Sequence, residues 1–142
     1  MDGISLWAPV ADLVSRLPQG AAHEAWKSSD RLEVLNGRTG QILVHPFAFH
    51  TDTMLRAEEL NLERAAKATS CPVLVVHGTL DPAVHQSEGK RLCEWTQRGS
   101  FEPIADADHV FGMRHPWPDA RIWPKHLEEA WRRHHAWLQS CP

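Results

Sequence analysis

Two polar side chains, Asp81 and His109, each follow a short extended stretch of chain and could act together in proton transfer. Asp81 comes shortly after the run Val-Leu-Val-Val at residues 73–76, and His109 follows a segment at residues 100–104. A catalytic histidine takes a proton from an attacking group and returns it to a leaving group, while a carboxylate fixes the tautomer of the imidazole. The two residue types in this order predict the acid and the base of one catalytic site.

The elements around these residues predict that they meet. Residues 73–76 are apolar and mostly β-branched, which is typical of a parallel strand buried on both faces. Gly78 ends this strand, so Asp81 lies just past its carboxyl end, where open α/β sheets place their chemistry. A helix over residues 86–97 and a strand over residues 100–104 then lead to His109. Because proline has no backbone N–H to donate, Pro103 predicts that this last strand lies at the edge of the sheet.

Each candidate has a second interpretation. Asp81 could be a turn acid that caps the next helix, and His109 could be a solvated loop histidine. The weaker candidates for the acid are Glu88, Asp106 and Asp52, of which the last does not follow a strand. The rivals for the base are His77 and His115. We expect His77 to pack at the end of its strand.

Several segments resemble the α/β-hydrolase superfamily. Residues 72–84 resemble its acid-bearing strand and loop, and residues 105–112 resemble its histidine loop. The longer stretch Asp-His-Val-Phe-Gly-Met-Arg-His-Pro-Trp at residues 108–117 is similar to the dienelactone-hydrolase-like and prolyl-oligopeptidase-like branches. Residues 6–12 resemble the strand that follows the nucleophile helix there. In this superfamily the nucleophile precedes the acid and the histidine, so the resemblance covers nearly the whole chain but only the C-terminal half of the family.

The resemblance implies an α/β fold: the C-terminal part of an α/β-hydrolase, with about three parallel core strands, flanking helices and a cap insertion. Residues 1–142 would form one partial domain. Residues 11–69 would be the cap-like insertion and linking helices, and residues 70–142 the acid loop, the histidine loop and the closing helix. Trp26, Phe47 and Phe49 are then candidate substrate contacts of the cap. The alternative is a poorly patterned loop.

Helical patterns complete the expected fold. Residues 51–60 and 62–68 are predicted to be helical, with Asn61 as the N-cap of the second helix. Pro124 suits the first turn of a final helix. In that helix one apolar stripe is expected at Leu127, Trp131, His134 and Leu138.

The sequence lacks the motif that carries the nucleophile in this superfamily. The chain contains neither Gly-x-Ser-x-Gly nor Gly-x-Cys-x-Gly, the glycine pairs that a sharp strand-to-helix turn requires. Ser70, Ser87 and Ser100 lack those glycines, Cys71 precedes a proline, and Cys93 falls inside a predicted helix. We therefore expect the nucleophile and the oxyanion hole in a half of the protein that precedes this chain.

The composition of the chain limits which partners, location and cofactors are expected. A formal net charge of -3 gives no reason to expect nucleic acid or an anionic membrane as a partner. No apolar run approaches the roughly 18 residues of a spanning helix, and no signal segment opens the chain, so a cytoplasmic protein is expected. Three widely spaced cysteines read as reduced thiols. No histidine or cysteine spacing matches a metal motif, so neither a metal nor a cofactor is expected.

By resemblance, the chain belongs to a serine hydrolase that acts on small-molecule ester, lactone or peptide-like acyl bonds. It would supply Asp81 and His109 to a Ser-Asp-His triad and, by itself, be inactive. The alternative is a non-catalytic fragment or pseudoenzyme that acts as a binding module. The strand from Ile4 to Ala8 would leave one edge unpaired, which favours self-association.

Overall fold

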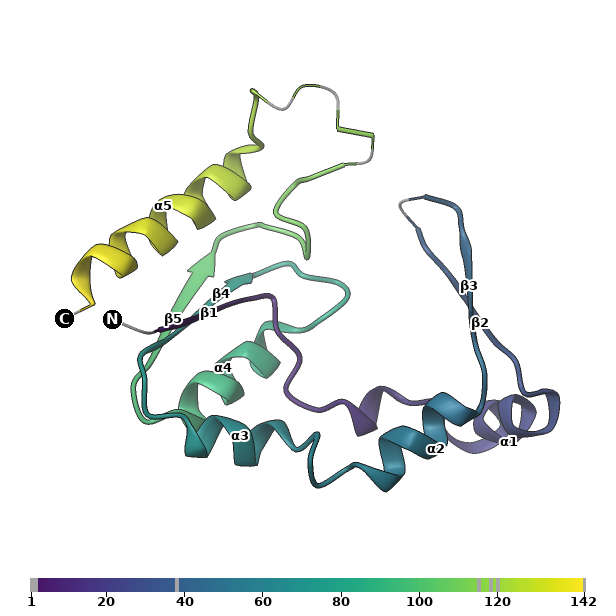
Figure 1. The fold of residues 1–142 in the computed structure, drawn as a ribbon. Coiled ribbons are helices and arrows are strands. Elements are labelled where there is room, and N and C mark those ends of the chain that lie inside the picture. Colours follow the sequence, from purple (N-terminus) through teal and green to yellow (C-terminus); the bar gives the residue numbers. More distant parts are fainter. Residues whose placement is uncertain (1–2, 38, 115, 118, 120, 142) are drawn as a thin grey trace. The chain divides into compact units, whose positions relative to one another are not determined.

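The computed structural model describes residues 3–37, 39–114, 116–117, 119 and 121–141. The chain divides into two units, of which unit 1 comprises Met1–Ala11 and Leu62–Pro142 and unit 2 comprises Asp12–Asn61. The elements of unit 1 are β1 (Ile4–Trp7), α3 (Leu62–Ala68), β4 (Val73–Gly78), α4 (Gln86–Trp95), β5 (Gly99–Ile104) and α5 (Lys125–Ser140) (Figure 1). The elements of unit 2 are the 3-10 helix η1 (Val14–Arg16), α1 (Gly20–Ser29), β2 (Leu32–Leu35), β3 (Ile42–His45) and α2 (Ala48–Leu55).

Unit 1 is built on a parallel sheet with the strand order β1-β4-β5. Val73 of β4 lies opposite Ile4 on one side and Gly99 on the other. Every residue of β4 is buried, which fits its β-branched sequence. Pro103 lies in β5, an edge strand of the described sheet, where a missing N–H is tolerated. The predicted α/β class with a three-stranded parallel core is confirmed.

Two helices cover opposite faces of this sheet (Figure 1). Successive strand residues point to opposite faces. Val75 and His77 lie against Gly89 of α4, whereas Leu74 and Val76 pack in one core cluster with Ala130 of α5. Both faces of the central strand are thereby buried, which leaves its carboxyl end to carry functional groups.

The predicted stripe on the last helix is wrong in part. Trp131 and Leu138 are 48% and 47% exposed. Leu127 of the predicted stripe packs against the core, together with Ala130 and Trp137, which lie outside the stripe. The small side chain of Ala130, fully buried, sits where the helix meets the sheet, so the contact face is rotated from the one that the large side chains indicate.

Unit 2 has its own small core around Trp26. This side chain is 1% exposed, its Nε1 donates to the His45 carbonyl at 2.9 Å, and its ring lies 5.4 Å from that of Phe47. Strands β2 and β3 pair as an antiparallel hairpin. The predicted helix over residues 51–60 is shifted, because α2 starts at Ala48 and ends at Leu55, before the non-helical backbone of Arg56.

Candidate active site

The carboxylate of Asp81 is held in the loop that follows β4. Its Oδ1 accepts hydrogen bonds from the backbone N–H groups of Ala83 at 2.8 Å and Val84 at 2.9 Å. The side chain has no exposed surface. Both bonds are local, so the short Asp side chain folds its own loop into a turn. One carboxylate oxygen is thus fixed, and Oδ2 is left for another partner.

The electrostatics of Asp81 favour its charged form. Burial is the largest single influence and acts to raise the pKa of the carboxyl. The hydrogen bonds from Val84, His109 and Ala83 together outweigh burial, and the pKa lies below its usual value. Asp81 is therefore a carboxylate at neutral pH and can only accept hydrogen bonds.

His109 supplies the partner for Oδ2. Its Nδ1 lies 2.9 Å from Asp81 Oδ2. Because a carboxylate cannot donate, Nδ1 carries the proton, and in the neutral ring Nε2 is then an acceptor. The His109 side chain is 40% exposed, in contrast to the buried acid. This is the arrangement in which an imidazole can take a proton at Nε2 while an acid fixes its tautomer.

The loop around His109 is shaped by its neighbour Asp108. Oδ1 of Asp108 accepts from the backbone of Gly112 at 2.8 Å and of Val110 at 3.2 Å, and Oδ2 accepts from Arg114 at 3.0 Å. Burial acts to raise the pKa of Asp108, but these bonds and the guanidinium charge lower it overall. The loop then continues into Phe111, a buried residue with a φ of 55° whose ring meets that of Trp7 at 5.4 Å. Asp108 therefore orders the histidine loop from inside.

Backbone hydrogen bonds join the acid loop to the histidine loop. Leu80 N–H donates to the Ala107 carbonyl at 3.0 Å, and Asp106 N–H donates to Thr79 Oγ1 at 2.8 Å. Gly78 permits this approach: a Cβ there would lie 2.3 Å from the Ala107 carbonyl oxygen. The glycine at the end of β4 is thus required for the packing of the two loops as well as for the turn.

His77 packs at the end of β4, as expected from the sequence, and it also contacts the acid loop, which the sequence did not indicate. It is fully buried, and its Nε2 lies 2.8 Å from the Val84 carbonyl oxygen and 3.3 Å from Asp81 Oδ2. The signal that could have found it is its position: it shares a face of β4 with Val75 and precedes the acid by four residues. A polar residue on a buried face needs a partner, and the nearest polar group is the acid loop.

The other candidates for the acid and the base lie elsewhere in the chain. Glu88 accepts from the Ala11 backbone N–H at 3.0 Å, Asp106 is exposed, and Asp52 is in α2 of unit 2. His115 lies outside the described residues. The acid that contacts His109 is Asp81.

Neither Ser87 nor Cys93 lies at a sharp strand-to-helix turn, because both belong to α4. Ser87 Oγ lies 2.9 Å from His85 Nδ1, inside the N-cap of α4. Burial raises the pKa of the Cys93 thiol, with a further contribution from Glu94, so this cysteine is less often a thiolate.

Among the described residues, no group of three His, Cys, Asp or Glu side chains could hold a metal ion. No described helix is long and apolar enough to cross a membrane.

The three cap candidates lie in unit 2 and differ in exposure. Trp26 is buried, Phe47 is half-buried, and Phe49 is 51% exposed. Phe49 also lines an apolar cavity of about 450 Å³ with Leu13 and Leu60. Their role as substrate contacts stays a prediction, strongest for Phe49.

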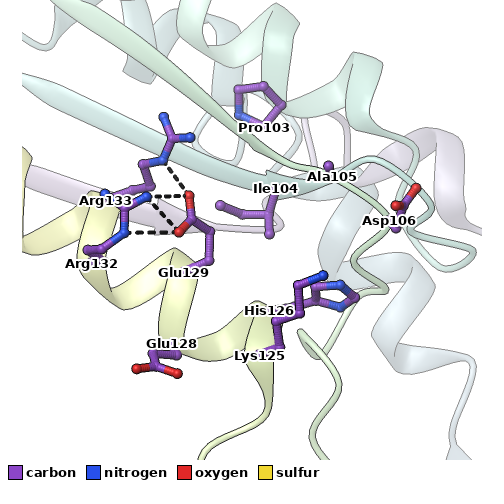
Figure 2. A pocket seen from close by; sticks show the side chains of 10 residues that line it. All are labelled: Pro103, Ile104, Ala105, Asp106, Lys125, His126, Glu128, Glu129, Arg132 and Arg133. Carbon is purple, nitrogen blue, oxygen red and sulfur yellow. Dashed lines mark hydrogen bonds and ion pairs between the residues drawn. The ribbon is translucent and has the colours of Figure 1, made fainter.

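A separate pocket of about 440 Å³ opens between the end of β5 and α5 (Figure 2). Two of its cationic groups are paired within the protein, because Glu129 accepts hydrogen bonds from both Arg132 and Arg133. Arg133 is also paired with Glu102. Neither Asp81 nor His109 lines this pocket, so it is separate from the Asp81–His109 pair.

Comparison with known proteins supports the fold of the chain. No protein-family model matches the sequence, and no curated protein matches it. Among solved structures, one from Agrobacterium vitis S4, which bears only the provisional name hydrolase, is similar with a TM-score of 0.66 and 20% identity. The match covers 94% of this chain and 48% of that one. An esterase domain from a Rhodothermus marinus protein is similar over 78% of this chain and 43% of its own, with 17% identity and a TM-score of 0.49. The chain thus spans about half the length of these structures. The likeness to the Agrobacterium vitis structure shows the fold alone, which is that of part of an α/β-hydrolase.

Proposed function

We propose that this chain supplies the acid and the base of a Ser-Asp-His triad to a hydrolase of ester, lactone or peptide-like acyl bonds. The observation that carries the proposal is the 2.9 Å contact between His109 Nδ1 and Asp81 Oδ2 at neighbouring strand ends. A buried, ionised acid and an exposed imidazole are what the two roles require. The resemblance of residues 108–117 to the dienelactone-hydrolase-like and prolyl-oligopeptidase-like branches supports this substrate class.

In this mechanism His109 Nε2 takes the proton of an attacking serine and later donates it to the leaving group. Asp81 stays ionised, holds Nδ1–H, and stabilises the imidazolium. The serine and the oxyanion donors come from sequence outside this chain, because the 142 residues contain no nucleophile motif. Without them a substantial part of the rate acceleration is lost.

The second candidate function is a non-catalytic binding module, and the missing nucleophile motif is the observation that favours it. The in-frame coding sequence upstream of Met1 separates the two. A Gly-x-Ser-x-Gly after a strand there supports the hydrolase, and the longer product should hydrolyse a chromogenic ester. An upstream sequence without a nucleophile, or a longer product without turnover, would favour the binding module.

A further inference from the structure

Resting on the proposed function, we infer that His77 is a positioning residue that clamps the acid loop and aims the Asp81 carboxylate at His109. His77 is fully buried, with a relative exposure of 0%. The nitrogens of a buried imidazole need hydrogen-bond partners within the protein. One of the two nitrogens of His77 has such a partner.

The tautomer of His77 follows from its surroundings. Nε2 lies 2.8 Å from the Val84 carbonyl oxygen, which can only accept, so Nε2 carries the proton. Nδ1 is buried and has no hydrogen-bond partner among the described residues. It faces Gly89 of α4, where a Cβ would lie only 2.4 Å from it. The ring is therefore a donor toward the acid loop on one edge and packs against a helix on the other.

Val84 is consequently held from two directions. Its N–H donates to Asp81 Oδ1 at 2.9 Å, and its carbonyl accepts from His77 at 2.8 Å. The loop that ties the carboxylate is thus attached to β4 through the imidazole. His77 Nε2 also lies 3.3 Å from Asp81 Oδ2, the same oxygen that His109 contacts at 2.9 Å. Oδ2 lies between two imidazoles, one buried and one exposed, and this fixes its direction.

The role is distinct from catalysis, because His77 has no exposed surface through which to reach a substrate. It acts through Val84 and Asp81. Gly89 is the matching feature on α4, since any side chain there would push the ring away from the loop. The pair explains a glycine in the middle of a helix, where it weakens helix formation.

The test is nitrogen-15 NMR of histidine side chains in the full chain. In the parent, His109 should be protonated at Nδ1 and His77 at Nε2. His77→Met, which has no donor, should shift the His109 tautomer ratio toward that of exposed His135, and His77→Gln, which keeps an N–H donor, should restore it. His135→Gln is the matched control and should leave the His109 signature unchanged.

The NMR results distinguish a failure of the proposed function from a failure of the role of His77 alone. If the parent lacks Nδ1–H on His109, the Asp81–His109 pair fails, and the proposed function fails with it. If that signature is present but unaffected in folded His77→Met, only the role of His77 is overturned. Should the variant not fold, the parent still decides, because a His77 ring protonated at Nδ1 rather than Nε2 contradicts the clamp.

Discussion

Oδ2 of Asp81 and Nδ1 of His109 lie 2.9 Å apart, although 28 positions of sequence separate the two residues. The contact joins the ends of two adjacent parallel strands. It pairs a carboxylate with no exposed side-chain surface with an imidazole that is 40% exposed. The acid loop, the histidine loop and Gly78, where the two loops approach each other, are arranged around this pair.

The stability of unit 1 should depend on pH through Asp81. Because its folded-state pKa is lowered below the unfolded value of about 3.9, the ionised carboxylate contributes stability that is complete above that value. The contribution is lost as pH falls through the lower, folded-state pKa. Urea unfolding of Asp81→Asn between about pH 6 and pH 3 should therefore show a smaller loss of unfolding free energy than the parent. Asp106→Asn, at an exposed acid, is the control. If Asp81→Asn loses as much unfolding free energy as the parent when the pH falls, Asp81 does not contribute the pH-dependent stability.

Gly78→Ala should separate the two loops of the site. The new Cβ would meet the Ala107 carbonyl oxygen at 2.3 Å and that of Asp108 at 2.8 Å. We expect a loss of about 1–3 kcal/mol in unfolding free energy, measured by thermal or urea denaturation. Gly37→Ala, where a Cβ meets nothing within 4 Å, should change stability little. Equal effects of the two substitutions would contradict the close approach at Gly78.

The cap residues should divide into a structural and a functional one. Trp26→Ala removes a buried ring and its bond to His45, and should cost about 3–5 kcal/mol of stability. Phe49→Ala, at a half-exposed ring, should cost below about 1 kcal/mol. In the complete hydrolase, Phe49→Ala should instead alter substrate preference, measured as kcat/KM for short and long acyl esters. A large stability loss at Phe49 with unchanged preference would remove it as a substrate contact.

The edge of β1 should promote self-association of the isolated chain. In the described sheet β1 has a neighbour only on the side of β4. Unpaired edges of this kind template further pairing. Light scattering should show dimers or larger species at rising concentration, and Ile4→Lys, at a 40% exposed edge position, should reduce them. A monodisperse parent monomer would count against this interface.

Much of the sheet and the placement of the two candidate site residues could be predicted because their signals are local. The buried run in β4, the glycine that ends it and the acid three residues later are all visible in sequence. The order of acid and histidine adds the connection between neighbouring strands. These signals depend on backbone preference and burial, which a single segment encodes.

What the sequence did not reveal depends on contacts between segments. The role of His77 requires knowing that Val84 folds back over it, and the role of Gly78 requires the approach of Ala107. The strand β2 was missed because the hairpin β2-β3 is largely exposed on both faces, so no alternation of apolar and polar residues marks it. The stripe on α5 was misjudged because a small residue, Ala130, forms the centre of the contact.

The central claim is tested most directly by the kcat for a chromogenic ester of this chain joined to the sequence that carries its nucleophile. His109→Ala should remove nearly all turnover, and Asp81→Asn should lower kcat by up to ~10⁴-fold because it favours the wrong tautomer of the imidazole. His135→Ala, at an exposed histidine of α5, is the control and should retain full activity. Turnover that survives His109→Ala, or that the chain shows alone and loses when one of its own serines or cysteines is changed, would contradict the account.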